Sequence, residues 1–138
     1  AMALSGLYSV PVELNLKKIR KVSALVRRTA GHELEPWKPV VGENLFMRES
    51  GAVASQFHIP EAIEPFSADL VGATRAIVLG KKSGIDSIAI KSQELGLSLT
   101  TEQQQGVLAA VKRAGTEKRG LVSDSEFRAI VLQLQQTV

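Results

Sequence analysis

Two short stretches of the chain hold most of its chemically useful side chains. In the first, Arg48 to Gly51, a cation, a carboxylate (Glu49) and a hydroxyl (Ser50) follow one another. In the second, Leu79 to Gly84, glycines flank Lys81, Lys82 and Ser83 just before a predicted helix. Free N–H groups and partial positive charge at a helix start favour an anion. The turn lacks the spacing of a phosphate-binding P-loop, so it is either a capped strand-to-helix turn or an anion site.

Metal and nucleophile chemistry have little support in the sequence. His32 and His58 are the only histidines, and neither lies at metal-ligand spacing from the other. The absence of cysteine excludes disulfides, thiolate zinc sites and cysteine nucleophiles. Glu43 and Glu49 are close in sequence and could act as a carboxylate pair, or they could be surface or loop residues. We therefore expect no catalytic residue, metal or cofactor in this chain alone.

Charge and hydropathy narrow the classes of partner. The 138-residue chain has a formal net charge of +3. An anionic partner or the solvated face of an amphipathic helix could explain the basic residues of the first third. These are Lys17, Lys18, Arg20, Lys21, Arg27 and Arg28. No nucleic-acid motif accompanies them, and no apolar run approaches the ~20 residues of a membrane helix. We expect no nucleic acid, no membrane and a cytoplasmic location.

The elements that must position these side chains are mostly helices. Apolar residues at helical spacing predict a helix from Asn15 to Ala30, followed by Gly31 as its C-terminal glycine. Ala76 to Leu79 is short, apolar and bounded by glycine, which indicates a strand. Ser83 is then expected to cap a helix that ends at Gly96. Two further helices are predicted. Thr100 begins the one that ends near Ala114, and the Ser123/Glu126 capping box begins the one that reaches near the C-terminus.

The segment from Glu35 to Leu70 breaks this regularity. Its prolines fix φ and remove backbone donors, so no long helix can cross it. Val40 to Phe46 is expected to be extended, with a short helix from Gly51 to Phe57. The fold class is therefore mainly α: a small helical domain with one or two short strands and a long irregular, proline-containing segment. The sequence predicts that the chain is divided into three parts: a linker helix (2–34), an irregular segment (35–72) and a helical subdomain (73–138).

Short motifs in a fixed order give the chain a recognisable pattern. They are Pro39 to Phe46, Arg48 to Gly51, Glu64-Pro65-Phe66, Leu70-Val71-Gly72, Arg75, Leu79 to Gly84, Val111-Lys112, Lys118-Arg119 and Ser123 to Phe127. This order resembles the communication region that follows the catalytic barrel in homocitrate and isopropylmalate synthases. The predicted helix from Asn15 to Ala30 is similar to the one that leaves that barrel. The resemblance covers nearly the whole chain.

The resemblance implies a transferase of amino-acid biosynthesis. Such enzymes condense an acyl-CoA, usually acetyl-CoA, with a 2-oxoacid and then hydrolyse the thioester. A divalent metal in their (β/α)8 barrel polarises the 2-oxoacid. This chain is too short to hold that barrel of about 250 residues. It would be a C-terminal fragment that contacts its own barrel and a second subunit, dimerises, and caps the partner's active site. Residues expected to contact substrate or barrel are Glu49, Ser50, Gly51, His58, Arg75, Lys81 and Ser83.

Four positions depart from the family pattern. The family usually has His where this chain has Arg48 and Val53, Tyr where it has Ile63, and His where it has Lys82. The second of these His residues is implicated in proton transfer, which Val53 cannot perform. The parent enzyme could have diverged in substrate and acid/base group, could take its proton chemistry wholly from the barrel, or could be inactive. His58 is a candidate replacement.

Other classes of function stay open at this point. One alternative is a stand-alone helical binding or regulatory module descended from such enzymes, which Met2 as a natural start would favour. A nucleic-acid-binding domain would rest only on the basic first helix, and an autonomous enzyme lacks a metal set or nucleophile–base pair. The product could be homocitrate, isopropylmalate, citramalate or another acid, because the barrel reads the 2-oxoacid side chain. Monomer and dimer are both open for the isolated chain.

Overall fold

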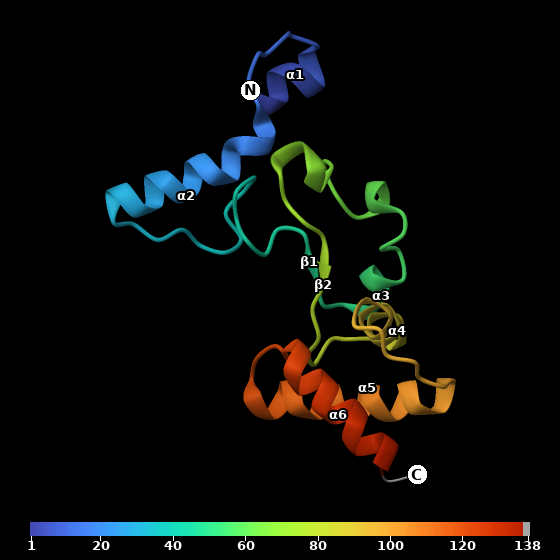
Figure 1. The fold of residues 1–138 in the computed structure, drawn as a ribbon. Helices are drawn as coiled ribbons and strands as arrows, with labels where there is room; N and C mark the ends of the chain where they lie inside the picture. The colour runs from blue at the N-terminus through green and yellow to red at the C-terminus, as the bar shows by residue number, and fades with distance from the viewer. Residues whose placement is uncertain (137–138) are drawn as a thin grey trace. The chain divides into compact units, whose positions relative to one another are not determined.

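A computed structural model describes residues 1–136, and it is mainly helical, as expected (Figure 1). The chain forms two compact units that are discontinuous in sequence. The first contains residues 1–46 and 66–74, and the second contains residues 47–65 and the chain from Arg75 onward. The three-part division expected from sequence stays a prediction. Within the described residues, no helix combines the length and hydropathy needed to cross a bilayer.

The first unit is built on a long amphipathic helix. A 3₁₀ turn, η1 (Leu16–Lys18), leads into α2 (Ile19–Ala30), and Gly31 ends it with a φ of 63°. This confirms the helix predicted from periodicity. A short helix, α1 (Met2–Tyr8), precedes it and was not predicted. The small core contains Phe46 together with residues of η3 (Ala68–Val71).

The prediction of an extended segment from Val40 to Phe46 is wrong, because this stretch forms consecutive turns. The Gly42 N–H donates to the Lys38 carbonyl (2.7 Å), and the Gly42 carbonyl accepts from Arg20 (3.1 Å). A Cβ at Gly42 would lie 2.5 Å from the Pro36 carbonyl oxygen. Local backbone bonds and the Arg20 side chain, rather than a strand partner, therefore satisfy these polar groups of the segment.

The second unit begins with a minimal parallel sheet. β1 (Met47–Arg48) pairs with β2 (Ala76–Ile77), with Met47 opposite Ala76 and Arg48 opposite Ile77. The predicted strand is confirmed but shorter, and Leu79 instead forms an antiparallel bridge with Val122. After β1 the chain forms α3 (Gly51–Ala54) and the 3₁₀ turn η2 (Pro60–Ala62). The helix expected from Gly51 to Phe57 is therefore real but ends early.

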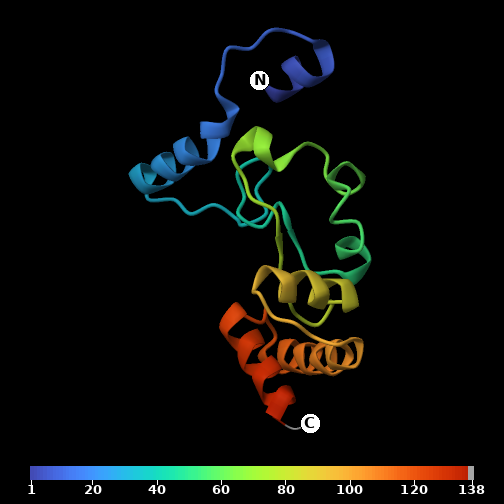
Figure 2. The same ribbon diagram turned by 45° about the vertical axis from the view of Figure 1, so that its right-hand side comes forward.

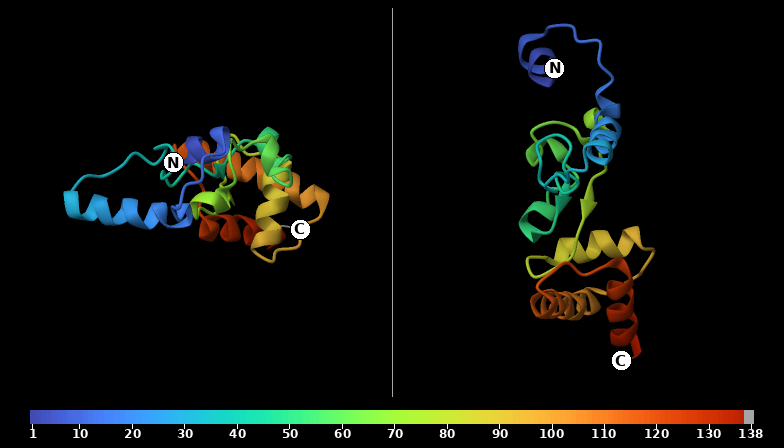
Figure 3. Two further views of the ribbon diagram at one scale, coloured as in Figure 1. Left: turned by 90° about the horizontal axis from the view of Figure 1, so that it is seen from above. Right: turned by 90° about the vertical axis from the view of Figure 1, so that its left-hand side faces the viewer.

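Three helices complete the second unit: α4 (Ile85–Glu94), α5 (Thr101–Lys118) and α6 (Asp124–Gln136). α4 contacts α3, β2 and α5, and α6 lies across α5 (Figures 2 and 3). The buried core runs through all three helices and the sheet. It contains Ala54, Ile77, Leu79, Ile88, Val107, Val111, Val122, Phe127 and Val131.

The predicted N-caps of α5 and α6 are confirmed. The Thr100 hydroxyl accepts from the Gln103 N–H (3.2 Å), and the Gln103 side chain accepts from the Thr100 N–H (2.9 Å). Ser123 and Glu126 form the second capping box. The Lys118 ammonium, then the N–H and hydroxyl of Ser123, donate to the Glu126 carboxylate and lower its pKa to about 2.

The predicted cap at Ser83 is wrong. α4 begins after Gly84, whose N–H donates to the Ser87 hydroxyl (3.3 Å), so Ser83 is not the cap. Gly96 follows the end of α4 with a φ of 68°, as predicted. α5 also continues past its predicted end near Ala114, through the buried Gly115 to Lys118. A glycine is needed at position 115 because α5 packs there directly on the backbone of Gly80 and Lys81, which leaves no room for a side chain.

Candidate functional site

The turn from Gly80 to Gly84 is the most tightly held part of the candidate site. The Ser83 side chain is buried, and its hydroxyl accepts from the Gly80 N–H at 3.0 Å. In return, the Ser83 N–H donates to the Gly80 carbonyl at 3.2 Å. Ser83 therefore closes the turn through a side chain-to-backbone bond. This contact accounts for a serine here without any contact to a ligand.

Glu49 and Gly51 clamp the same turn from the segment after β1. The Glu49 carboxylate accepts from the Lys82 N–H (2.9 Å), and the Gly51 N–H donates to the Lys82 carbonyl (3.2 Å). A Cβ on Gly51 would lie 2.5 Å from the Gly84 Cα, so the two backbones touch. The structure thus brings together four residues that the sequence placed in separate clusters: Glu49, Gly51, Lys81 and Ser83.

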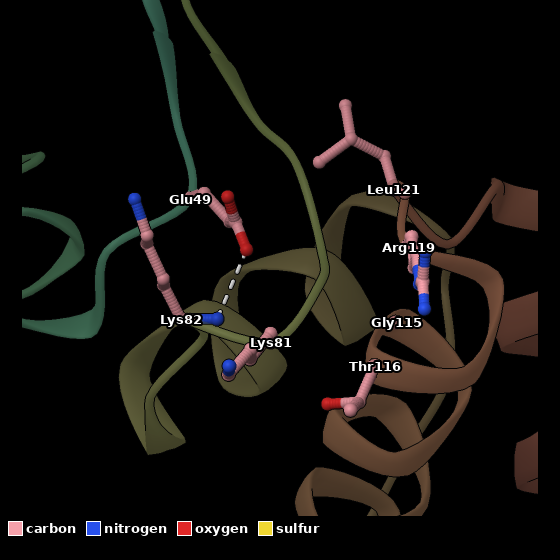
Figure 4. A pocket seen from close by; sticks show the side chains of 8 residues that line it. Glu49, Lys81, Lys82, Gly115, Thr116, Arg119 and Leu121 are labelled. Atoms are coloured by element: carbon pink, nitrogen blue, oxygen red, sulfur yellow. Dashed lines mark hydrogen bonds between the residues drawn. The ribbon is translucent and has the colours of Figure 1, made fainter.

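A basic cleft lies between this turn and the end of α5 (Figure 4). Its volume is about 490 Å³. We define the basic cleft by its lining residues: Glu49, Lys81, Lys82, Gly115, Thr116, Arg119, Gly120 and Leu121. Arg119 comes from the helix end on the opposite wall from the lysines, while Glu49 lies above the turn in this view. Three cationic side chains against one carboxylate give the cleft a positive formal charge.

Backbone shape makes the cleft possible. Gly115 packs directly on the turn, because a Cβ there would lie 2.8 Å from the Lys81 nitrogen and 3.0 Å from the Gly80 Cα. Arg119 ends α5 in the left-handed region, with a φ of 53°. This conformation is usually taken by glycine at a helix end. Its adoption by an arginine places a long cationic side chain in the lining of the cleft.

Of the predicted contact residues, only Glu49 and Lys81 line the basic cleft. Ser50 precedes α3, where its carbonyl accepts from the N–H groups of Val53 and Ala54. The Arg75 guanidinium holds both oxygens of the Glu64 carboxylate, at 2.9 and 3.0 Å, and the Glu64 side chain is only 3% exposed. His58 lines a separate hollow formed by α3 and α4, together with Asp86. Arg75 and His58 are therefore not part of one cluster with Lys81.

Sequence reasoning missed the wall of the cleft formed by α5. The sequence predicts that this helix ends near Ala114, before Thr116 and Arg119, and nothing in their spacing points to the turn some 35 residues earlier. The signal that could have found them is a glycine, Gly115, inside an otherwise good helix, since such a glycine often marks a close packing contact. Within residues 1–136, no group of three or more His, Asp or Glu could hold a metal ion. The divalent metal implied by the resemblance thus has no fitting donor set in the described residues.

Fold and site together define a class of protein: a mainly helical domain in which a glycine-lysine turn is clamped by the segment after β1. Comparison with known proteins identifies the family. Residues 40–119 match the family model described as "Homocitrate synthase post-HMGL domain-like". The chain belongs to this family.

The relatives of this chain are named as synthases of several different products. It is 34% identical over 131 residues to homocitrate synthase 1 of Nostoc sp., and 36% identical over 131 residues to a putative (R)-citramalate synthase, CimA, of Archaeoglobus fulgidus. It is also 36% identical over 127 residues to a 2-phosphonomethylmalate synthase of Streptomyces rubellomurinus. These alignments cover 94, 94 and 91% of this chain. They cover only 35, 27 and 34% of the relatives, so the chain spans about a third of their length.

Proposed function

We propose that this chain is the post-barrel part of an acyl-CoA:2-oxoacid condensing synthase, where it dimerises the enzyme and caps the partner's active site. Condensation would take place in a separate barrel, which would bind the divalent metal and supply Lewis-acid chemistry. The chain's own residues would position the barrel mouth and exclude water from it. Glu49, Ser50 and Gly51 would contact the barrel or its substrates, with acetyl-CoA as the expected acyl donor.

The observation that carries this proposal is the uncovered apolar face of α2. Val22, Leu25 and Val26 are 56, 52 and 58% exposed, although they form one side of an amphipathic helix. No residue of α2 is buried within the chain. A helix stripe of this kind normally packs against a core. The relatives are about three times as long as this chain, so we assign the face to packing within the complete synthase dimer.

The coding sequence upstream of this segment gives the first test. An in-frame barrel of about 250 codons is the expected result. A stop codon directly before Met2 would overturn the proposal and leave a stand-alone binding module as the reading to pursue.

The second test substitutes the apolar face in the full-length synthase. Leu25→Asp should abolish the dimer, measured by light scattering after size exclusion, and should greatly reduce thiol release from acetyl-CoA across a panel of 2-oxoacids. Leu132→Asp is the matched control, because Leu132 is an equally exposed leucine (56%) on α6. A dimeric, active Leu25→Asp enzyme would contradict the assigned role of α2.

A third test concerns Glu49, one of the three residues expected to contact the barrel mouth. Glu49→Gln keeps the shape of the side chain but weakens its bond to the Lys82 N–H, which is charge-assisted in the native protein. We expect a lower turnover of the full-length enzyme with the CD spectrum of the chain unchanged. Full activity of Glu49→Gln would remove Glu49 from the barrel-contacting set.

A further inference from the structure

We propose that the basic cleft binds a phosphate-bearing small molecule, with Lys81 and Arg119 holding a diphosphate group from opposite walls. This site is separate from the apolar face of α2 and does not depend on the proposed dimer. The proposal rests on unpaired charge, a fixed turn and a strained arginine, which are independent features of the second unit.

The first feature is the charge of the cleft. Lys81, Lys82 and Arg119 form no ion pair with any residue in the described part of the chain. Within residues 1–136, four other basic residues are paired with carboxylates, namely Arg27, Arg75, Lys91 and Lys118, and exposed ones such as Lys112 and Arg113 are not. What distinguishes the cleft is that three cations line one hollow. The one carboxylate of the cleft, Glu49, already accepts from the Lys82 N–H. Three cations against one occupied carboxylate raise the local potential, and an anion entering the cleft would lower it.

The second feature is that the turn is fixed before any ligand arrives. Hydrogen bonds from Gly80 to Ser83, from Lys82 to Glu49 and from Gly51 to Lys82 hold its backbone. Gly115 packs on the same backbone and removes the remaining freedom. The origins of the lysine side chains are therefore fixed, so that binding an anion orders only the side chains themselves. Preorganisation of this kind favours affinity because less conformational entropy is lost.

The third feature is the conformation of Arg119. A non-glycine residue in the left-handed region costs roughly 1–2 kcal/mol relative to a right-handed one. Gly120, which adopts this conformation more readily, is the very next residue. The chain nevertheless places the arginine at the strained position, on the wall of the cleft. Strain of this kind concentrates at ligand sites.

Phosphate chemistry fits this set better than a carboxylate ligand does. A guanidinium binds phosphate oxygens in pairs, and lysine adds a compact charge. The Thr116 hydroxyl donates to the Lys112 carbonyl (2.8 Å), so the cleft offers charged donors and little neutral specificity. A volume of about 490 Å³ is larger than one phosphate needs and leaves room for a diphosphate with an attached group. The α5 carbonyls near Arg119 oppose an anion, so the cationic side chains must supply the affinity.

The test is calorimetric titration of this chain with pyrophosphate at constant ionic strength. We expect saturable binding that Lys81→Gln and Arg119→Gln each weaken about tenfold, since each removes a charge-assisted bond. Lys112→Gln and Arg113→Gln are the matched controls, because both residues are exposed on α5 and neither lines the cleft. The controls should bind pyrophosphate as the native chain does.

Three results would overturn the site. They are no saturable binding of pyrophosphate, equal losses in the cleft and control variants, or binding that Arg119→Gln leaves unchanged. The last would assign Arg119 to neutralising the end of α5 only. Titrations with ADP and with CoA, which both carry a diphosphate, identify the source of the phosphate: tighter binding of CoA points to an acyl-CoA tail, and equal binding to a general diphosphate site. Loss of this site would leave the Leu25→Asp result, and with it the proposed function, untouched.

Discussion

Adding one methyl group at Gly115 is the most direct perturbation of the clamped turn. The Cβ of Gly115→Ala would lie 2.8 Å from the Lys81 nitrogen and 3.0 Å from both the carbonyl carbon and Cα of Gly80. These are backbone atoms of a turn that several hydrogen bonds hold, so they cannot rotate aside as a flexible side chain would. Either α5 or the turn must therefore move, at the expense of the contacts that define the cleft.

The expected magnitude follows from two opposing effects. Overpacking a buried site costs about 1–3 kcal/mol, and the rigid backbone neighbours place Gly115 at the upper end of that range. Replacing glycine with alanine in a helix interior returns about 1 kcal/mol. We expect a net destabilisation of about 2 kcal/mol. Urea unfolding followed by CD at 222 nm measures it, because α4, α5 and α6 contain 10, 18 and 13 residues of helix in the second unit.

Gly106 provides the matched control on the same helix. A Cβ there would meet only the Leu134 side chain, at 3.8 Å, which is an ordinary contact. Gly106→Ala should therefore stabilise the chain by about 0.5–1 kcal/mol. If Gly115→Ala proves as stable as Gly106→Ala, the close packing of α5 on the turn is wrong. The turn would then not be held in place by α5, and the cleft would not be preorganised.

Three further predictions concern caps and ion pairs. Thr100→Ala should cost about 1 kcal/mol, measured by urea unfolding, because it removes the hydroxyl that caps α5. Arg75→Gln should cost about 3 kcal/mol by leaving the buried Glu64 carboxylate without its charged partner; a double variant that also carries Glu64→Gln should recover part of the loss, and no recovery would contradict the pairing. The bond from Lys118 is the largest contribution to lowering the Glu126 pKa to about 2. A carboxylate whose pKa is lowered in the folded state stabilises the protein at pH values above the ordinary carboxyl pKa, and this stabilisation is lost as the pH falls toward 2. The stability difference between the native chain and Glu126→Gln should therefore shrink between pH 4.5 and 2, and a difference independent of pH would contradict this assignment.

The helices were predictable because their signals are local. Apolar spacing fixed α2, and the Thr100 and Ser123 caps fixed the starts of α5 and α6 within a few residues of sequence. The segment from Val40 to Phe46 was not predictable in the same way. Its apolar residues favour a strand, but its backbone bonds are closed by turns and by Arg20 from a distant helix. Tertiary contacts of this kind override local propensity.

The candidate site was half predictable for the same reason. Glu49, Lys81 and Ser83 stood out through their types and their place beside a glycine turn, but the sequence could not show that Glu49 bonds to that turn. Arg119 was invisible as a site residue, because its position depends on where α5 ends and on its left-handed backbone. Ser83 was misassigned as a cap, since its hydroxyl serves the Gly80 N–H inside the turn.

The structure gives a physical reason why position 82 can depart from the family pattern. Lys82 holds the clamp through its backbone alone, because its N–H donates to Glu49 and its carbonyl accepts from Gly51. The side chain at this position can therefore change from the family's usual histidine without loosening the turn. What the change does alter is charge, because a lysine is fully cationic near neutral pH and a histidine is mostly neutral. Under the proposal that the basic cleft binds a phosphate-bearing molecule, a substitution that leaves the turn intact and adds a positive charge to the cleft lining is expected to change which anion the cleft prefers.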